Sequence, residues 1–248
     1  MKNKNCSVLT LTLVFATACS SLSHKKDEAA LQNVKKVAVV AFMADEPASA
    51  GIGFSLNSHQ LGAEAGGSLI PQHSESVDQM LAALEESFAK KMRWQVLDTK
   101  RMISNPGYAQ AYHQTMDGWQ SKGPPNRGLN RYLVEKVMDY DCTRILDRPG
   151  RDKLITDLGV DAIISSNVRV YNAGNSVMGL GSRHPQANLS FAMYIKGRDE
   201  PVWFEGRVAG DESKESVGST HFTDEEKTAK LSLASAKTAF ERIGSEEK

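Results

Sequence analysis

Two stretches near the C-terminus alternate between apolar and other side chains, and this pattern constrains the fold more than any other feature of the sequence. The apolar positions are Leu189, Phe191, Met193 and Ile195 in the first stretch, and Val202, Phe204, Gly206 and Val208 in the second. A period of two places successive side chains on opposite faces of a strand, so each stretch predicts a strand with one buried face. Residues 197–200 predict a hairpin connection between the two strands.

The rest of the chain supplies further strands and helices in an order that defines the fold class. The predicted elements are strands at residues 37–42, 94–97 and 160–171, and helices that start at residues 76, 152 and 223. Strands and helices that alternate in this way form a sheet with helices packed on it. We therefore predict the α/β (α+β) class, with a mixed β-sheet of about five strands packed with helices.

We predict a single α/β domain over residues 35–243 that carries one helical insertion. The insertion covers about residues 101–148, where glycines and prolines break the pattern repeatedly. Two helical pieces are predicted inside it, at residues 108–119 and 129–140. Residues 45–72 are rich in Gly, Ala and Ser and predict a long loop, and loops of this length are usually functional or disordered.

Residues 1–18 have the features of a secretory signal peptide. Two lysines precede an apolar run of about a dozen residues, which is too short to span a bilayer as a helix and typical of a signal core. The run ends in small residues before Cys19, which resembles the lipobox of bacterial lipoproteins except for Ala16, where Leu is usual. The resemblance implies cleavage before Cys19 and lipid attached to this cysteine. The alternative is an ordinary signal peptide cut near Ala18.

Lipid on Cys19 would make the membrane the first partner of the protein, because two or more acyl chains hold a protein stably on a bilayer. Residues 19–34 then form a lipidated polar tether, and residues 244–248 form a disordered tail at the other end. Serines at positions 20 and 21, in place of aspartate, resemble the enterobacterial signal for the outer membrane. This implies an outer-membrane anchor that faces the periplasm; the inner membrane and the cell surface stay open as alternatives.

Composition narrows the class of partner and the means of stabilisation. Cys6 leaves with the signal and Cys19 would carry lipid, so Cys142 stays alone and the mature chain can form no internal disulfide. Acidic residues outnumber basic ones by two once Lys2 and Lys4 are removed, and no basic block stands out. A nucleic acid partner is therefore not expected.

The motifs that most often identify an enzyme are missing from the sequence. It contains neither the HExxH helix of zinc proteases nor the GxSxG elbow of serine hydrolases. His59, Glu64 and His73 could together ligate a metal, but their spacing matches no established site. Cys142 could serve as a nucleophile, although a structural thiol is the better expectation. We predict no enzymatic activity, no catalytic residues, no metal and no cofactor, with an envelope hydrolase as an alternative.

Aromatic and methionine side chains provide a better functional signal. Four of them would line one face of a helix in the insertion: Tyr108, Tyr112, Met116 and Trp119. If exposed, this stripe would suit a protein partner, because interfaces are enriched in aromatic residues and Met. The alternative is that the stripe packs the insertion onto the domain. Trp203 lies on the face of its strand opposite Val202 and Phe204. It is a second candidate contact if helices cover one side of the sheet, and a core residue if they cover both.

Four short motifs, taken in order, resemble one group of envelope proteins. They are VAVVAF at residues 37–42, VLD at 96–98, LGVDAII at 158–164 and DEPVW at 199–203. In this order and spacing they are similar to the α/β domain of curli-secretion (CsgG-like) lipoproteins, penicillin-binding-protein activator lipoproteins and the amino-terminal domain of TolB. The long insertion and the large first loop depart from the pattern of the group, so no binding surface is carried over from a member.

The resemblance implies work in the cell envelope without catalysis. We predict a lipid-anchored periplasmic binding or assembly factor that acts through protein–protein contacts, with a peptidoglycan synthase or a secretion component as the partner. The first alternative is a subunit of a homo-oligomeric outer-membrane secretion complex. It ranks lower because neither residues 45–72 nor the insertion shows the paired alternating strands of a membrane hairpin. A small-ligand binder at the 45–72 loop is a weaker alternative.

Overall fold

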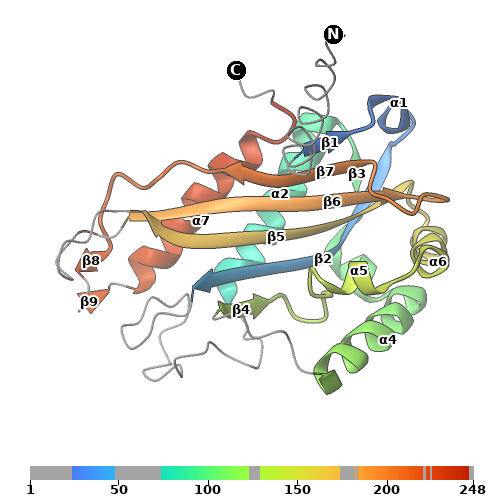
Figure 1. The fold of residues 1–248 in the computed structure, drawn as a ribbon, viewed down its shortest axis with the longest axis horizontal. Coiled ribbons are helices and arrows are strands. Elements are labelled where there is room, and N and C mark those ends of the chain that lie inside the picture. The colour runs from blue at the N-terminus through green and yellow to red at the C-terminus, as the bar shows by residue number, and fades with distance from the viewer. Residues whose placement is uncertain are drawn as a thin grey trace, which may run out of the picture.

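A seven-stranded mixed sheet forms the centre of the computed structural model (Figure 1). The structure describes residues 24–47, 74–122, 129–173, 182, 184–219, 222–223 and 225–245. The strands are β1 (His24–Lys26), β2 (Lys36–Pro47), β3 (Gln95–Val96), β4 (Leu129–Leu133), β5 (Ala162–Ala173), β6 (His184–Ile195) and β7 (Trp203–Ala209).

The order of the strands in the sheet is β1-β7-β6-β5-β2-β3, with β4 also paired to β2. β2 is parallel to β3 and β5, and the other pairs are antiparallel. The predicted class and mixed sheet are confirmed. Strands β8 (Gly218–Ser219) and β9 (Phe222–Thr223) form a separate small sheet.

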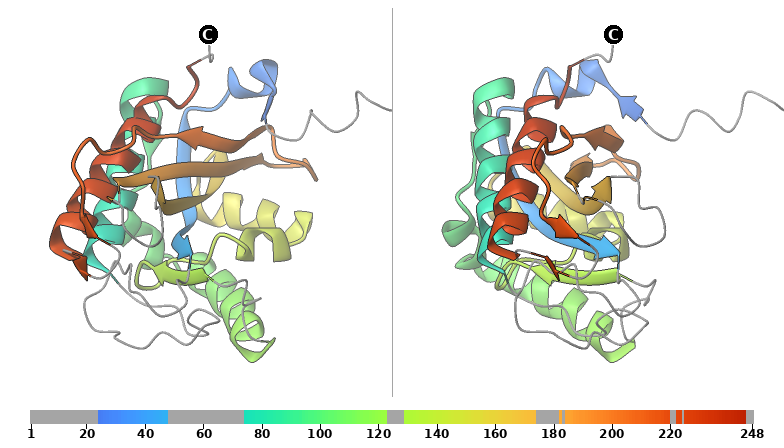
Figure 2. Two further views of the ribbon diagram at one scale, coloured as in Figure 1. Left: turned by 60° about the vertical axis from the view of Figure 1, so that its left-hand side comes forward. Right: turned by 90° about the vertical axis from the view of Figure 1, so that its left-hand side faces the viewer.

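Helices α2 (Glu75–Met92) and α7 (Glu225–Glu241) lie side by side on one face of this sheet (Figure 2). The buried residues of α2 recur at helical spacing, as the sequence predicts: Val77, Met80, Leu81, Leu84 and Phe88. The Phe88 ring meets Phe191 of β6 edge to face, with 5.5 Å between the ring centroids. Trp203 of β7 packs against Phe191 in the same way at 5.0 Å. This helical layer and the apolar side of the strands form the main core.

The helices that the structure describes cover only part of the other face of the sheet. Helix α6 (Arg148–Leu158) packs there, and the Arg151 guanidinium lies over the ring of Tyr194 on β6, 4.7 Å from its centroid. The helix ends at Gly159, whose φ of 60° is the left-handed conformation that the sequence predicts at this stop. Helix α4 (Pro106–Lys122) packs beside α6 (Figure 1). The short helices α3 (Thr99–Ile103) and α5 (Cys142–Ile145) pack against α4.

The predicted helix at residues 129–140 is wrong. Its first half is β4, which pairs antiparallel with the end of β2 from Pro47↔Leu129 to Met43↔Leu133. Lys136 has φ of 59°, which a right-handed helix does not allow. Pairing to β2 comes from a segment distant in sequence, so the local pattern did not reveal it.

The tether predicted over residues 19–34 is also wrong from His24 onward. Residues His24–Lys26 form β1, and Glu28–Leu31 form helix α1, which Asp27 caps at its N-terminus. β1 pairs with β7, from His24↔Glu205 to Lys26↔Trp203. Backbone hydrogen bonds to β7 order the polar β1, and the core residues Leu31 and Val34 hold the segment around α1 against the domain.

A bulge in β7 changes which of its side chains are buried. The facing pairs are Leu189–Val208 and Phe191–Glu205, which leaves Gly206 and Arg207 together opposite Ser190. An extra residue of this kind reverses the alternation of faces. Trp203 and Val208 therefore lie on the same face, toward the helices, and Trp203 is fully buried.

Among the helices in the described ranges, none is both long enough and apolar enough to cross a membrane.

Candidate functional site

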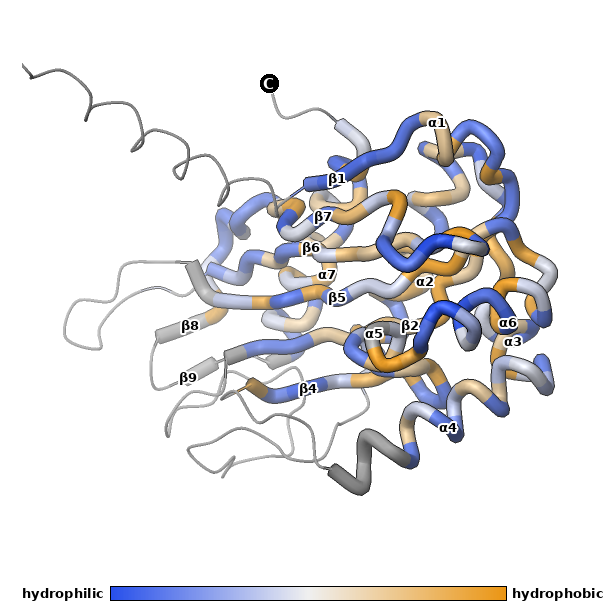
Figure 3. Tube along the Cα trace, turned by 45° about the vertical axis from the view of Figure 1, so that its right-hand side comes forward, coloured by the Kyte–Doolittle hydropathy of each residue, from blue (hydrophilic) through white to orange (hydrophobic). Residues whose placement is uncertain are grey.

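A groove of about 350 Å³ lies on the second face of the sheet, where helix α6 no longer covers the strands. Side chains of β2, β4, β5, β6 and β7 and of the segment before α5 line it, and most of them are polar. We call this hollow the polar groove. Figure 3 shows hydrophilic stretches of β2 and β4 next to each other at this part of the sheet.

The period of two that buries one face of each strand also builds the polar groove on the other face. In β5, Asn167 and Arg169 line the groove, while Val168 between them is fully buried on the helix-covered face. In β6, Asn188 and Ser190 take the same side, and Asn188 faces Arg169 across the pair of strands. The two faces therefore differ because alternate residues of the same strands differ in polarity.

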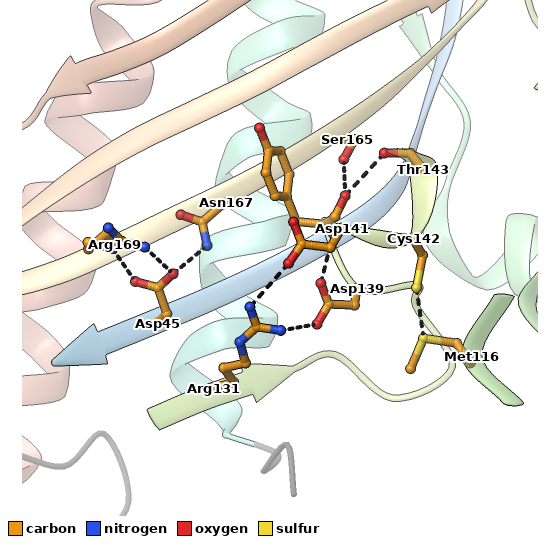
Figure 4. Close-up of polar contacts among 11 residues, drawn as sticks. Asp45, Met116, Arg131, Asp139, Asp141, Cys142, Thr143, Ser165, Asn167 and Arg169 are labelled. Atoms are coloured by element: carbon orange, nitrogen blue, oxygen red, sulfur yellow. Dashed lines mark hydrogen bonds and ion pairs between the residues drawn. The ribbon is translucent and has the colours of Figure 1, made fainter. Parts of the chain in front are cut away.

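Asp45, Asn167 and Arg169 form the first charged cluster of the groove, with Asp45 at its centre (Figure 4). Its Oδ1 accepts a hydrogen bond from Arg169 Nε at 2.6 Å, and its Oδ2 accepts from Arg169 Nη2 at 3.0 Å and from Asn167 Nδ2 at 2.9 Å. Asp45 is only 1% exposed. A two-pronged contact of this kind fixes the plane of the guanidinium, and the hydrogen bond to Asp45 raises the pKa of Arg169. Arg169 itself stays half exposed, at 51% of its side chain.

Arg131, Asp139 and Asp141 form the second cluster, which connects β4 to the segment before α5 (Figure 4). Its Nη1 lies 3.3 Å from Asp139 Oδ2, and its Nη2 lies 3.1 Å from Asp141 Oδ2. Burial raises the pKa of Asp139 to about 6, although the Asp141 backbone N–H and Arg131 both act in the opposite direction. Arg131 and Asp139 are both buried, so this cluster supports the groove wall.

Cys142 lies behind this wall and faces away from the groove. It is fully buried, and its Sγ lies 3.3 Å from Met116 Sδ (Figure 4). Burial raises the pKa of the thiol to about 12, with Asp139 adding to the effect. A nucleophilic cysteine acts as the thiolate, so this environment argues against the catalytic role considered from the sequence.

The histidines that the structure describes contact polar groups of the protein. His24 Nδ1 lies 2.8 Å from Glu205 Oε2, and His184 bonds to the Ser213 carbonyl oxygen and the Ser182 hydroxyl. The candidate metal ligands of the sequence, residues 59, 64 and 73, lie outside the described residues, as does most of the 45–72 loop. In the ranges that the structure describes, no group of three or more His, Cys, Asp or Glu is placed to hold a metal.

The predicted aromatic stripe lies on α4 but does not form an exposed surface. Tyr108 and Met116 are buried, and the Tyr108 hydroxyl donates to the Val40 carbonyl oxygen at 2.9 Å and accepts from the Met138 backbone N–H at 3.0 Å. These two residues pack the insertion onto the domain, so the prediction of a partner contact is wrong for them.

The other residues predicted to contact a partner or to carry lipid are Tyr112, Trp119, Trp203 and Cys19, and their environments differ. Tyr112 is half-buried against the core. The backbone of Trp119 belongs to α4, but its side chain is not among those that the structure describes. Trp203 is a core residue, because it pairs with Met193 on the helix-covered face, and its indole N–H donates to Glu205 Oε1 at 2.8 Å. Cys19 precedes the first described residue.

A larger hollow of about 830 Å³ lies between β1, the edge of β7 and the end of α7. Most of its charged groups already have partners within the protein: Lys26 with Glu28, His24 with Glu205, and Arg242 with Asp211. Arg207 lines both hollows and makes no ion pair with any described residue. We take the polar groove as the candidate site because it carries the fixed charges.

The residues of the polar groove were missed by the sequence analysis. The available signal was a change of pattern: β2 and β5 each begin apolar and then acquire Asp45, Asn167 and Arg169 at every second position. A strand that buries both faces has no need of charged residues, so such a change indicates that one face has become open to water.

Comparisons with known proteins leave the chain without a family. No family model matches it, and no curated protein matches it. Among solved structures it is similar to the crystal structure of the lipoprotein GNA1162 from Neisseria meningitidis, at 11% sequence identity and a TM-score of 0.35. The match covers 73% of this chain and 86% of that one. A similarity at this level assigns no family, and the resemblance to the CsgG-like group stays a prediction from the sequence.

Proposed function

We propose that the protein is a non-catalytic binding module of the cell envelope, anchored by lipid on Cys19, that contacts a partner protein through the polar groove. One observation carries the proposal: among the described residues, part of the second sheet face forms a groove whose charged groups are held in fixed positions by buried partners. A surface that is already ordered loses little conformational freedom on binding, which favours recognition.

The position of β1 supports the anchored arrangement. Only residues 20–23 separate Cys19 from His24, the first residue of β1. Five residue steps span at most about 17 Å. Lipid on Cys19 would therefore hold the β1 edge of the sheet close to the bilayer.

The buried state of Cys142 supports the non-catalytic part of the proposal. A thiol with a pKa near 12 is protonated at neutral pH and unsuited to nucleophilic attack. The fixed ion pairs of the groove likewise serve positioning, because each buried charge is matched by an opposite one.

The test of partner binding is photo-crosslinking in living cells. A photoreactive benzoylphenylalanine replaces Asn188, which lines the groove, or Ala82, an exposed residue on the opposite helical layer as the matched control. We expect a defined envelope protein to be captured from position 188 and not from position 82. Capture from neither position would contradict the groove as a contact surface, and crosslinks of the chain only to itself would favour the homo-oligomeric complex instead.

The test of the anchor is metabolic labelling with an alkyne fatty acid. We expect the full chain to incorporate the label and to fractionate with membranes, and Cys19→Ala to lose both properties. Cys142→Ala serves as the control for a thiol elsewhere in the chain. Equal labelling of the full chain and the Cys19→Ala variant would refute lipid attachment at this residue.

A further inference from the structure

We infer that the polar groove recognises an acidic segment of its partner protein, with a carboxylate of that segment lying between Arg169 and Arg207. The inference rests on the proposed function and adds the chemistry of the ligand. It follows from which charges of the groove are used within the protein and which are left over.

Two of the three arginines that line the groove are held by carboxylates, but to different degrees. Arg131 is buried, and both of its terminal nitrogens contact aspartates. Arg169 uses only Nε and Nη2 to contact Asp45, and its Nη1 donates no hydrogen bond to the described residues. Arg169 is therefore fixed in orientation while still presenting donors to solvent.

Arg207 is the third arginine, and it has no carboxylate partner among the described residues. It is exposed, and its Nη2 donates to the Tyr171 hydroxyl at 3.2 Å. The bulge at Gly206 and Arg207 places this side chain at the groove, as bulges often redirect a side chain toward a functional site.

The two available guanidinium groups flank the same strip of the sheet. Arg169 faces Asn188 across β5 and β6, and Tyr171, two residues after Arg169 on the same face, holds Arg207. A guanidinium fork matches the planar geometry of a carboxylate, so two neighbouring forks suit a carboxylate ligand.

One positive charge of the groove has no carboxylate partner among the described residues. Asp45 pairs with Arg169, and Asp139 and Asp141 both contact Arg131, which leaves Arg207. A carboxylate between Arg169 and Arg207 would pair with this remaining charge, whereas a doubly charged phosphate would add negative charge beside Asp45. The half-buried ring of Phe204 lines the same groove and suits a peptide around that carboxylate.

The experiment adds arginine variants to the crosslinking at position 188. Full-length proteins carry Arg207→Gln, Arg207→Lys or the matched control Arg198→Gln, which removes a similarly exposed arginine from the β6–β7 connection outside the groove. We expect Arg207→Gln to abolish capture, Arg207→Lys to weaken it because the ammonium keeps the charge but not the fork, and Arg198→Gln to retain it. The crosslinked partner peptide should contain Asp or Glu.

A second measurement uses the captured segment as a synthetic, fluorescent peptide. Its affinity for the full chain in detergent is compared with that of a counterpart in which Asp and Glu are replaced by Asn and Gln. We expect the counterpart to bind about tenfold more weakly, equivalent to ~1.4 kcal/mol. Unchanged capture by Arg207→Gln, or equal affinity of the two peptides, overturns the inference while leaving the binding module intact. No capture by the parent protein overturns the proposed function itself.

Discussion

The two faces of the central sheet are made by the same strands but serve different purposes. On the helix-covered face, Phe191 and Trp203 are fully buried and stack edge to face with other aromatic rings. On the second face, the neighbouring positions of the same strands carry Asn188, Ser190 and Arg207, which line the polar groove. Because successive side chains of a strand point to opposite faces, the same strands form one face that stabilises the fold and one face that is available for contacts.

The division is not complete, because the second face is apolar where α6 covers it and polar beyond. Tyr194, under the Arg151 guanidinium, belongs to the covered part, and Asn188 belongs to the open part. Both residues lie on β6. The comparison therefore predicts large stability effects on the helix-covered face and small ones in the groove.

The largest effect is expected from removing an aromatic ring from the helix-covered face. Phe191→Ala should lower the free energy of unfolding by about 3–5 kcal/mol, because it leaves a cavity among Phe88, Trp203 and their neighbours. Urea denaturation measures this loss. Phe204→Ala on the groove side is the matched control and should cost less, because Phe204 is only half-buried. Equal losses would show that the two faces are packed alike.

A pH-dependent effect is expected next, from Asp139 behind the groove wall. Burial raises its pKa from 3.8 to about 6, so the folded protein keeps a proton that the unfolded chain has lost. The contribution of this residue to stability is therefore fully present below pH 3.8 and is lost as the pH rises to about 6, by up to ~3 kcal/mol.

Urea midpoints of the parent protein and Asp139→Asn, measured across this pH window, check the effect. Asparagine does not titrate, so the stability of the variant should change less with pH than that of the parent. The exposed Asp117 provides the control, and Asp117→Asn should follow the parent curve. Parallel curves for the parent and Asp139→Asn would contradict a raised pKa.

A smaller effect is expected at the Asp45–Arg169 pair. Arg169→Ala should destabilise by about 1–3 kcal/mol, because the buried Asp45 loses two hydrogen bonds. Adding Asp45→Asn should recover part of the loss, with a coupling of about 1 kcal/mol in a double-mutant cycle. Additive losses would mean that the pair is not a unit, and that Asp45 does not orient Arg169.

The smallest effect on stability is expected at Arg207, where the effect on binding is expected to be largest. Its side chain is exposed and makes no ion pair with the described residues, so Arg207→Gln should change the free energy of unfolding by less than about 0.5 kcal/mol. Thermal unfolding of the full chain measures this change. A loss comparable to that of Phe191→Ala would mean that Arg207 belongs to the stabilising face.

The sequence alone predicted the main elements and the fold class. The alternation in β6, the apolar run of β2 and the helical spacing from Val77 to Phe88 are local patterns that report burial within one element. In β7 the alternation predicted the strand but the wrong buried face, because Phe204 lines the groove and Trp203 is buried. The stop of α6 at Gly159 was equally local, because it depends on a single residue that accepts a left-handed conformation.

Tertiary structure alone decided the candidate site. β1 and β4 form because partner strands distant in sequence supply their hydrogen bonds, and a bulge reverses the side of β7 that is buried. From the sequence, the stripe that contains Tyr108 and Met116 could be either a contact surface or packing of the insertion, because periodicity does not tell what covers an apolar side. In the structure these two residues are buried. Within the described residues, α6 packs over the part of β6 that carries Tyr194, and the part that carries Asn188 lines the groove. Where a helix lies on a sheet is set by how the layers pack.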